Sequence, residues 1–270
     1  MNSQKDKKLN YLLRHWPKGM IATQNWLNSM GIYRQLADRY CQSQWLKRIG
    51  SGAYTLIDDT VNWLGAVYAL QKQLNYGVYL GAKTALALQG HIHYLQLGNS
   101  EGLWLFKVPS ETRKLPKWFQ VNFMNQYKVH YLNQDLFHPP EELNGLTTVI
   151  FEGLEVSIAS PERAIIEYID LLPKYFAPED IQLLMQGMTT LRPQLLQSLL
   201  ENCRSVKTKR LFLLFAEHEG HIWFNKLNLQ SISLGQGKRV IGRGGHYYPK
   251  YQISIPVKLE EHEGYADTEK

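Results

Sequence analysis

The sequence has 270 residues, 44% hydrophobic and 20% charged, and can form about two ordinary globular domains. No apolar run approaches the ~20 residues that span a bilayer, and MNSQKDKK at the N-terminus has no apolar segment behind it. We therefore expect no membrane contact, no signal peptide and a cytoplasmic location. The net charge is +6, but residues 1–57 alone carry nine lysines and arginines against two aspartates, which is +7. Such a segment favours a polyanionic partner, because neutralised phosphates supply most sequence-independent affinity for nucleic acid.

Residues 1–57 have the element order of a winged helix-turn-helix. The predicted helices cover about residues 4–15, 23–30 and 32–43. Thr23 is a good N-cap for the second helix, and Met30-Gly31 ends it. Two short apolar-alternating runs then flank Gly50-Ser51-Gly52, the pattern of a tight β-hairpin. A helix, a turn, a second helix and a basic hairpin in this order make DNA binding the leading hypothesis.

The third helix of this module is predicted to turn its apolar residues inward and a polar, basic face outward. A helix of this width fits the major groove, and a basic hairpin tip can reach phosphates or the minor groove. The start of the second helix can also offer backbone N–H groups to a phosphate. The candidate DNA contacts are Tyr33, Arg34, Gln35, Arg39, Lys47, Arg48 and Ser51, with Thr23 and Gln24 at the helix start. The alternative is that the arginines are merely solvated.

Residues 58–158 mix helical and strand-like patterns. A helix capped by Asp58-Asp59-Thr60 is predicted to run to about Leu74. A short helix is predicted over residues 82–89, and strands over residues 102–108, 119–125, 128–132 and 147–158. We read this as an α+β segment with a mostly antiparallel sheet. Because residues 58–202 have a net charge of −5, we expect no nucleic-acid binding by this part alone.

Residues 159–270 begin with a helix start at Ser160-Pro161-Glu162-Arg163. Glu162 and Arg163 could be catalytic, but capping and pairing is the favoured interpretation. Further helices are predicted over residues 178–186, 193–202 and 207–217, with strand-like pieces over residues 222–259. A second basic surface is predicted from Lys207, Lys209, Arg210, Lys238, Arg239 and Arg243. It could bind nucleic acid or an acidic protein, or be a solvated helix face beside a flexible hairpin.

Motifs for catalysis, metals and cofactors do not match. The glycine-rich GQGKRVIGRGG, residues 235–245, lacks the spacing of a P-loop and of a dinucleotide-binding fingerprint. His91, His93 and His138 have no carboxylate or cysteine at ligand spacing. No nucleophile elbow or zinc-protease helix is present in the sequence. We therefore expect no enzyme activity, no metal and no cofactor.

Three segments together resemble the AbiEi family of antitoxins from type IV toxin–antitoxin and phage-abortive-infection loci. They are WLKRIGSGAY at the hairpin, YLGAKTALALQGHIHYLQ in the middle, and SIASPERAIIEYI at the later helix start. The match in order and spacing covers about residues 5–255. The winged-helix pattern occurs in many protein families, whereas the Ser-Pro-Glu-Arg-Ala helix start, which accompanies it in this chain, is more specific.

The resemblance implies an α+β protein with an N-terminal winged helix-turn-helix, residues 1–57, and a larger antitoxin domain, residues 58–270. Within the larger domain we expect strand-rich, helical and strand-rich parts over residues 75–158, 160–217 and 221–259. The family implies repression of the chain's own operon at inverted repeats, with nucleoid association when DNA is bound. It also implies neutralisation of a co-encoded nucleotidyltransferase-like toxin. Two alternatives stay open: a ligand-sensing winged-helix regulator without antitoxin function, and a nucleic-acid-modifying enzyme.

Overall fold

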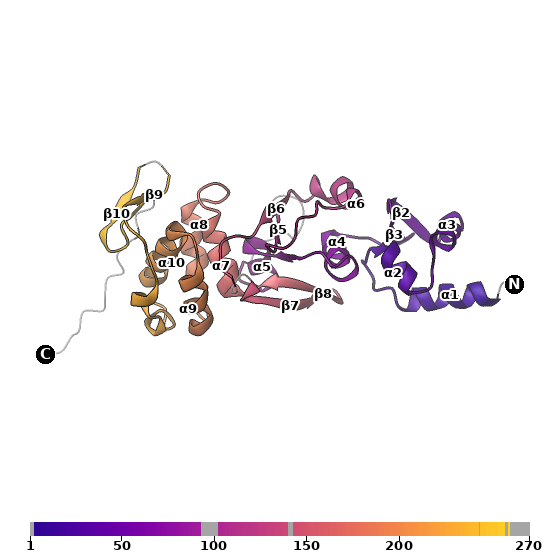
Figure 1. Cartoon of the computed structure of the whole chain (residues 1–270), viewed down its shortest axis with the longest axis horizontal. Helices are drawn as coiled ribbons and strands as arrows, with labels where there is room; N and C mark the ends of the chain where they lie inside the picture. Colours follow the sequence, from indigo (N-terminus) through magenta and orange to yellow (C-terminus); the bar gives the residue numbers. More distant parts are fainter. Residues whose placement is uncertain (1–2, 93–101, 140–142, 243, 257–258, 260–270) are drawn as a thin grey trace. The chain divides into compact units, whose positions relative to one another are not determined.

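A computed structural model describes residues 3–92, 102–139, 143–242, 244–256 and 259 (Figure 1). His93 and Arg243, two of the candidate residues above, lie outside these ranges. The chain divides into two compact units. The first takes the described parts of Met1–Leu80, Leu95–Asn133 and Leu146–Ile158, and the second those of Gly81–Tyr94, Gln134–Gly145 and Ala159–Lys270. The first unit joins residues on both sides of position 57, and the domain boundary predicted there stays a prediction.

The N-terminal part of the first unit contains the helices and the hairpin in the expected order. Its elements are α1 Ser3–Arg14, β1 Ala22–Thr23, α2 Gln24–Ser29, α3 Arg34–Gln42, β2 Leu46–Gly50 and β3 Ala53–Leu56. The hairpin strands and β1 form a small sheet in the order β1-β3-β2. The core is apolar and draws on every helix, with Leu12, Leu27, Ile32, Ala37 and Tyr40 all buried. This is the element order of a winged helix-turn-helix.

The helix after the hairpin starts later than predicted. Asn62 caps α4, Trp63–Tyr68, and its side-chain oxygen accepts from the Leu64 amide at 2.9 Å. A π-helical turn, η1 Ala69–Gln73, continues α4. Asp58-Asp59-Thr60 is therefore not the cap, since a carboxylate oxygen of Asp59 instead accepts from the Gly19 amide at 2.7 Å.

The first unit also contains a five-stranded sheet in the order β6-β5-β4-β8-β7. Its strands are β4 Val78–Leu80, β5 Leu103–Lys107, β6 Val129–Asn133, β7 Leu146–Phe151 and β8 Leu154–Ala159. The sheet is mixed: β4 is antiparallel to β5, whereas β5 and β6 are parallel and so are β4 and β8. The prediction of a mostly antiparallel sheet was wrong, and β4 is too short to give a periodic signal.

The strand predicted over residues 119–125 is helical. It falls on α6, Lys117–Phe119, and on the π-helical turn η2, Gln120–Met124. Its residues looked alternating, but Val121 is 79% exposed while Phe119 and Phe123 are buried. Parallel neighbours need a crossover connection, and this helical segment lies in the connection between β5 and β6.

The second unit is mainly helical. Its helices are α5 Ala82–Leu88, α7 Pro161–Asp170, α8 Pro178–Gln186, α9 Pro193–Asn202 and α10 Val206–His218. Each of the three predicted Pro-led starts has proline in the first turn, where no backbone N–H is needed. No helix in the described ranges is long and apolar enough to cross a bilayer.

The C-terminal part of this unit is less strand-rich than predicted. It has three short 3-10 turns, η4 Phe224–Lys226, η5 Leu229–Ser231 and η6 Pro249–Tyr251. The strands are β9 Arg239–Val240, β10 His246–Tyr248 and β11 Ile253–Ile255, in the order β10-β11-β9. The fold class is α+β, as expected.

Candidate nucleic-acid interface

Helix α3 has one buried face and one polar face. Ala37 and Tyr40 are buried in the module, as helical spacing requires. The predicted DNA-contacting side chains lie on the other side and are exposed, namely Tyr33, Arg34, Gln35 and Arg39. Tyr33, at the N-cap position, is 67% exposed. The structure therefore brings these four residues together on the outer face of α3 and at its start.

The wing carries its cations on a strand and not at its tip. Lys47 and Arg48 lie in β2, opposite Thr55 and Tyr54, whereas the turn itself is formed by Ser51-Gly52. The expectation that both cations sit at the tip was wrong, because β2 extends as far as Gly50 before the chain turns. Lys47 and Ser51 are exposed.

Arg48 is tied to the helix face. Its guanidinium forms an ion pair with the carboxylate of Asp38 in α3, with side chains 40% and 43% exposed. It also donates to the Tyr54 hydroxyl at 3.3 Å and lies 5.3 Å from the centre of that ring. The wing strand and α3 therefore share a charged contact next to the residues predicted to contact DNA.

Thr23 and Gln24 are structural residues. Thr23 is 2% exposed, accepts from the Trp26 amide as N-cap, and donates its own amide to Gln73 at 2.7 Å. The Gln24 amide donates to the Gly52 carbonyl at 2.8 Å, and its side chain accepts from Tyr54. The predicted phosphate contact through these backbone N–H groups was wrong, because both groups are already bonded.

The tip of the wing is anchored within the first unit. The Asn122 amide group donates to the Ile49 carbonyl at 3.0 Å. A Cβ placed on Gly50 would lie 2.5 Å from the Cβ of Trp118, so the backbone here approaches α6 too closely for a side chain. The end of β2 is therefore held against α6 and η2.

A groove of about 540 Å³ lies beside this tip. Ser51 and Asn25 line it from the winged module, and Lys117 and Arg113 line it from the segment before α6. The sequence did not reveal these two cations as candidates, because the net charge of −5 over residues 58–202 masks the local run TRKLPK. Lys117 is exposed, so it adds a cation next to the wing.

Arg113 is held in place and is not a free cation. It donates to the Glu111 carboxylate at 2.6 and 2.9 Å and to the backbone carbonyls of Leu74 and Asn75. The hydrogen bonds from Arg113, with those from the Arg113 and Gly77 amides, lower the pKa of Glu111 to about 2. This pair fixes the groove wall rather than reaching out of it.

The predicted second basic surface does not form as expected. Lys209 and Arg210 in α10 are 5% and 1% exposed, and Lys207 donates to the carbonyls of Asp170 and Leu172. Arg210 donates to the carbonyls of Leu234, Gly235, Gly237 and Gln252. Burial lowers the pKa of both Lys207 and Lys209. Lys207 and Arg210 tie α10 to neighbouring backbone and Lys209 is buried, whereas Lys238 and Arg239 are exposed.

Glu162 and Arg163 both form ion pairs, which is the pairing favoured from the sequence. Glu162 accepts from the guanidinium of Arg192 at 2.9 and 3.0 Å. Desolvation raises the pKa of Glu162, but the hydrogen bonds outweigh it and the pKa is lowered overall. Arg163 is fully buried and donates to Glu167 at 2.8 Å and to the Asn144 carbonyl at 2.6 Å. Within the described ranges, no group of three His, Cys, Asp or Glu residues is arranged to hold a metal ion.

Two family descriptions match almost the whole chain. "Transcriptional regulator, AbiEi antitoxin, Type IV TA system" matches residues 100–256, and "Transcriptional regulator, AbiEi antitoxin N-terminal domain" matches residues 5–97. The chain belongs to the AbiEi family. The resemblance seen in the three sequence segments is therefore confirmed, and the AbiEi description names a transcriptional regulator and antitoxin.

A solved structure also resembles this AbiEi chain. The crystal structure of the RV2827C protein from Mycobacterium tuberculosis superposes with a TM-score of 0.58 at 14% identity, covering 93% of this chain and 91% of that one. At this identity the likeness supports the fold. No curated protein sequence matches the chain.

Proposed function

We propose that this AbiEi chain represses its own toxin–antitoxin operon by placing α3 in the major groove and the wing beside it. The observation that carries the proposal is a cationic surface without internal partners. Arg34, Arg39 and Lys47 are exposed, and none of them forms an ion pair within the ranges the structure describes. Burying these cations at an interface costs free energy unless phosphate oxygens or base edges accept their hydrogen bonds. DNA-binding helices use exposed cations in this way.

The proposed contacts divide by chemistry. Arg34, Gln35 and Arg39 are long polar side chains on one helix face and suit base edges or phosphates in the major groove. Lys47 and Ser51 on the wing suit the DNA backbone, and Lys117 beside the wing extends that role. Tyr33 at the start of α3 has an exposed ring and hydroxyl for a phosphate or sugar.

We further propose that two copies bind an inverted repeat. Two α3 helices would then enter the major groove about one turn, ~34 Å, apart or at a multiple of that spacing. The operator's two-fold symmetry would mirror that of the bound pair. The remainder of the chain would neutralise a co-encoded nucleotidyltransferase-like toxin, as the family resemblance implies.

The experiment is binding of the full chain to labelled DNA from upstream of its own gene. We expect Arg34→Ala and Arg39→Ala each to weaken binding about tenfold, since a good base or phosphate contact contributes roughly 1–3 kcal/mol. Arg204→Ala is the matched control. Arg204 is exposed in the second unit, and its substitution removes the same type of side chain as the α3 variants do. Wild-type affinity in both α3 variants would show that α3 does not recognise the DNA.

The same variants test the division of function. The Arg34→Ala/Arg39→Ala double variant should lose repression of a promoter fusion and still neutralise the neighbouring toxin in co-expression. Circular dichroism verifies that the variant is folded. A folded double variant that loses both activities would contradict the separation of DNA binding from antitoxicity.

A further inference from the structure

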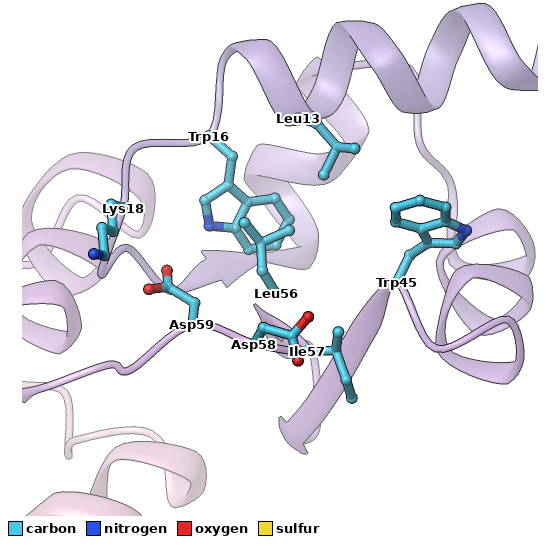
Figure 2. A pocket seen from close by; sticks show the side chains of 8 residues that line it. All are labelled: Leu13, Trp16, Lys18, Trp45, Leu56, Ile57, Asp58 and Asp59. Atoms are coloured by element: carbon cyan, nitrogen blue, oxygen red, sulfur yellow. The ribbon is translucent and has the colours of Figure 1, made fainter.

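A hollow of about 330 Å³ opens on the winged module, and none of the residues that line it is among those proposed to contact DNA. Its lining comes from α1 and the residues after it, from the residue before β2, and from the end of β3 and the residues that follow. The lining residues are Leu13, Trp16, Lys18, Trp45, Leu56, Ile57, Asp58 and Asp59. Figure 2 shows Trp16 and Leu56 in its middle, Trp45 at one end, and Asp59 with Lys18 at the other.

The apolar part of this hollow is left open by the fold. Trp45 is 47% exposed and Ile57 is 43% exposed, although both flank the hairpin strands. The Trp16 N–H donates to the Met20 carbonyl at 3.0 Å, so Trp16 offers the hollow only its apolar ring. Large side chains exposed around a concavity favour an apolar occupant, preferably aromatic because tryptophan rings stack well.

The polar end contains an unsatisfied carboxylate oxygen. One oxygen of Asp59 accepts from the Gly19 amide at 2.7 Å. The other, Oδ1, is buried and has no hydrogen-bond partner within the described ranges. A buried acceptor without a donor costs free energy, and here it leaves the negative charge of the Asp59 carboxylate only partly compensated at this end of the hollow.

Charge at this end favours a cationic donor. Asp58 stands next to Asp59 in the lining, and Figure 2 shows both carboxylates along one side of the hollow. Lys18 also lines this end and forms no ion pair with either aspartate in the described structure. Two carboxylates against one ammonium leave a net negative charge.

We propose that this hollow binds a small aromatic amine. The ammonium pairs with the carboxylates of Asp58 and Asp59 at the polar end, and the ring lies over Trp16 and Leu56 toward Trp45. The volume lies at the small end of ligand pockets, which matches a ligand of one or two rings. The site is separate from α3 and does not depend on the proposed contacts with DNA.

The test is isothermal titration calorimetry of the full chain with tryptamine as the probe. A ligand of this size predicts a Kd of order 1 mM. Indole-3-propionate is the matched ligand, because it keeps the ring and replaces the amine with a carboxylate. Binding of tryptamine with at least tenfold weaker binding of indole-3-propionate is expected. Equal affinity for both, or no saturation by tryptamine at ~10 mM, would overturn the proposal.

Variants locate the site on the protein. Asp59→Asn keeps an acceptor for Gly19 and removes the charge, and we expect it to weaken tryptamine binding about tenfold. Trp45→Ala removes a half-exposed ring with little effect on folding and should weaken binding as well. Asp135→Asn is the control, because Asp135 is exposed outside the module. Wild-type affinity in folded Asp59→Asn and Trp45→Ala would overturn the assignment. The assignment would also be overturned if sedimentation showed a dimer that Trp45→Ala dissociates but that tryptamine leaves intact.

Discussion

Replacing Asp38 with asparagine is expected to strengthen DNA binding. Asp38 lies in α3, and its carboxylate is paired with Arg48 of the wing. On the face that we propose contacts DNA, this carboxylate repels phosphate and also occupies a cation. Removing its charge therefore frees Arg48 for a phosphate and removes a repulsion.

The size of the effect follows from exposure. Ion pairs exposed to this degree, 40% and 43%, contribute only about 0–1 kcal/mol to folding, so Asp38→Asn should fold normally. Tyr54 still holds Arg48 through its hydroxyl and its ring. One added phosphate contact steepens the salt dependence of log K by about 0.9. The affinity gain should accordingly shrink about 3.5-fold between roughly 50 and 200 mM salt.

The assay is fluorescence anisotropy of a labelled duplex titrated at several salt concentrations. Asp135→Asn is the control, because it removes an exposed carboxylate elsewhere and should leave the slope unchanged. If Asp38→Asn binds more weakly with the wild-type slope, the reasoning fails. Asp38 would then be aligning Arg48 for a contact, and not competing for it.

Three further substitutions test the packing. Gly50→Ala should lower the free energy of unfolding by about 1–3 kcal/mol in urea, because its Cβ would lie 2.5 Å from that of Trp118; under ~0.5 kcal/mol would show that the wing tip is not packed. Glu167→Gln removes the charge that pairs with buried Arg163 in this ion pair and should cost about 3–5 kcal/mol, whereas a loss near zero would show that the pair does not stabilise the fold. Ionised Glu111 stabilises the fold above about pH 4.5 and loses this contribution as the pH falls toward 2, since its folded pKa is about 2. The difference in stability between wild type and Glu111→Gln should therefore shrink over that range. A constant difference would refute the assignment.

Elements with strong local signals were predictable. The helices α8 and α9 begin at Pro178 and Pro193 as predicted, because proline at the first helical position is fixed by local geometry. The exposed face of α3 was also predictable, since helical spacing decides which residues face the core. The hairpin around Ser51-Gly52 followed from its glycines.

Features that depend on distant partners were not predictable. Arg210 appeared to be a surface cation, but its guanidinium binds carbonyls 24 to 42 positions away, which no local pattern records. Asp59 appeared to be a helix cap and instead binds the Gly19 amide, 40 positions earlier. The alternation at Phe119, Val121 and Phe123 indicated a strand, but the segment is helical. The local pattern holds no record that β5 and β6 pair in parallel and so require a crossover connection here.

The most direct test of the central claim is site-specific photocrosslinking of the full chain to promoter DNA. A photoreactive side chain at Gln35 of α3 or Lys47 of the wing should crosslink to bases and backbone of the duplex. The same group at Leu183 or Ile150, which are 74% and 75% exposed elsewhere in the chain, should not. Crosslinks from Leu183 or Ile150 with none from Gln35 and Lys47 would contradict DNA reading by α3 and the wing.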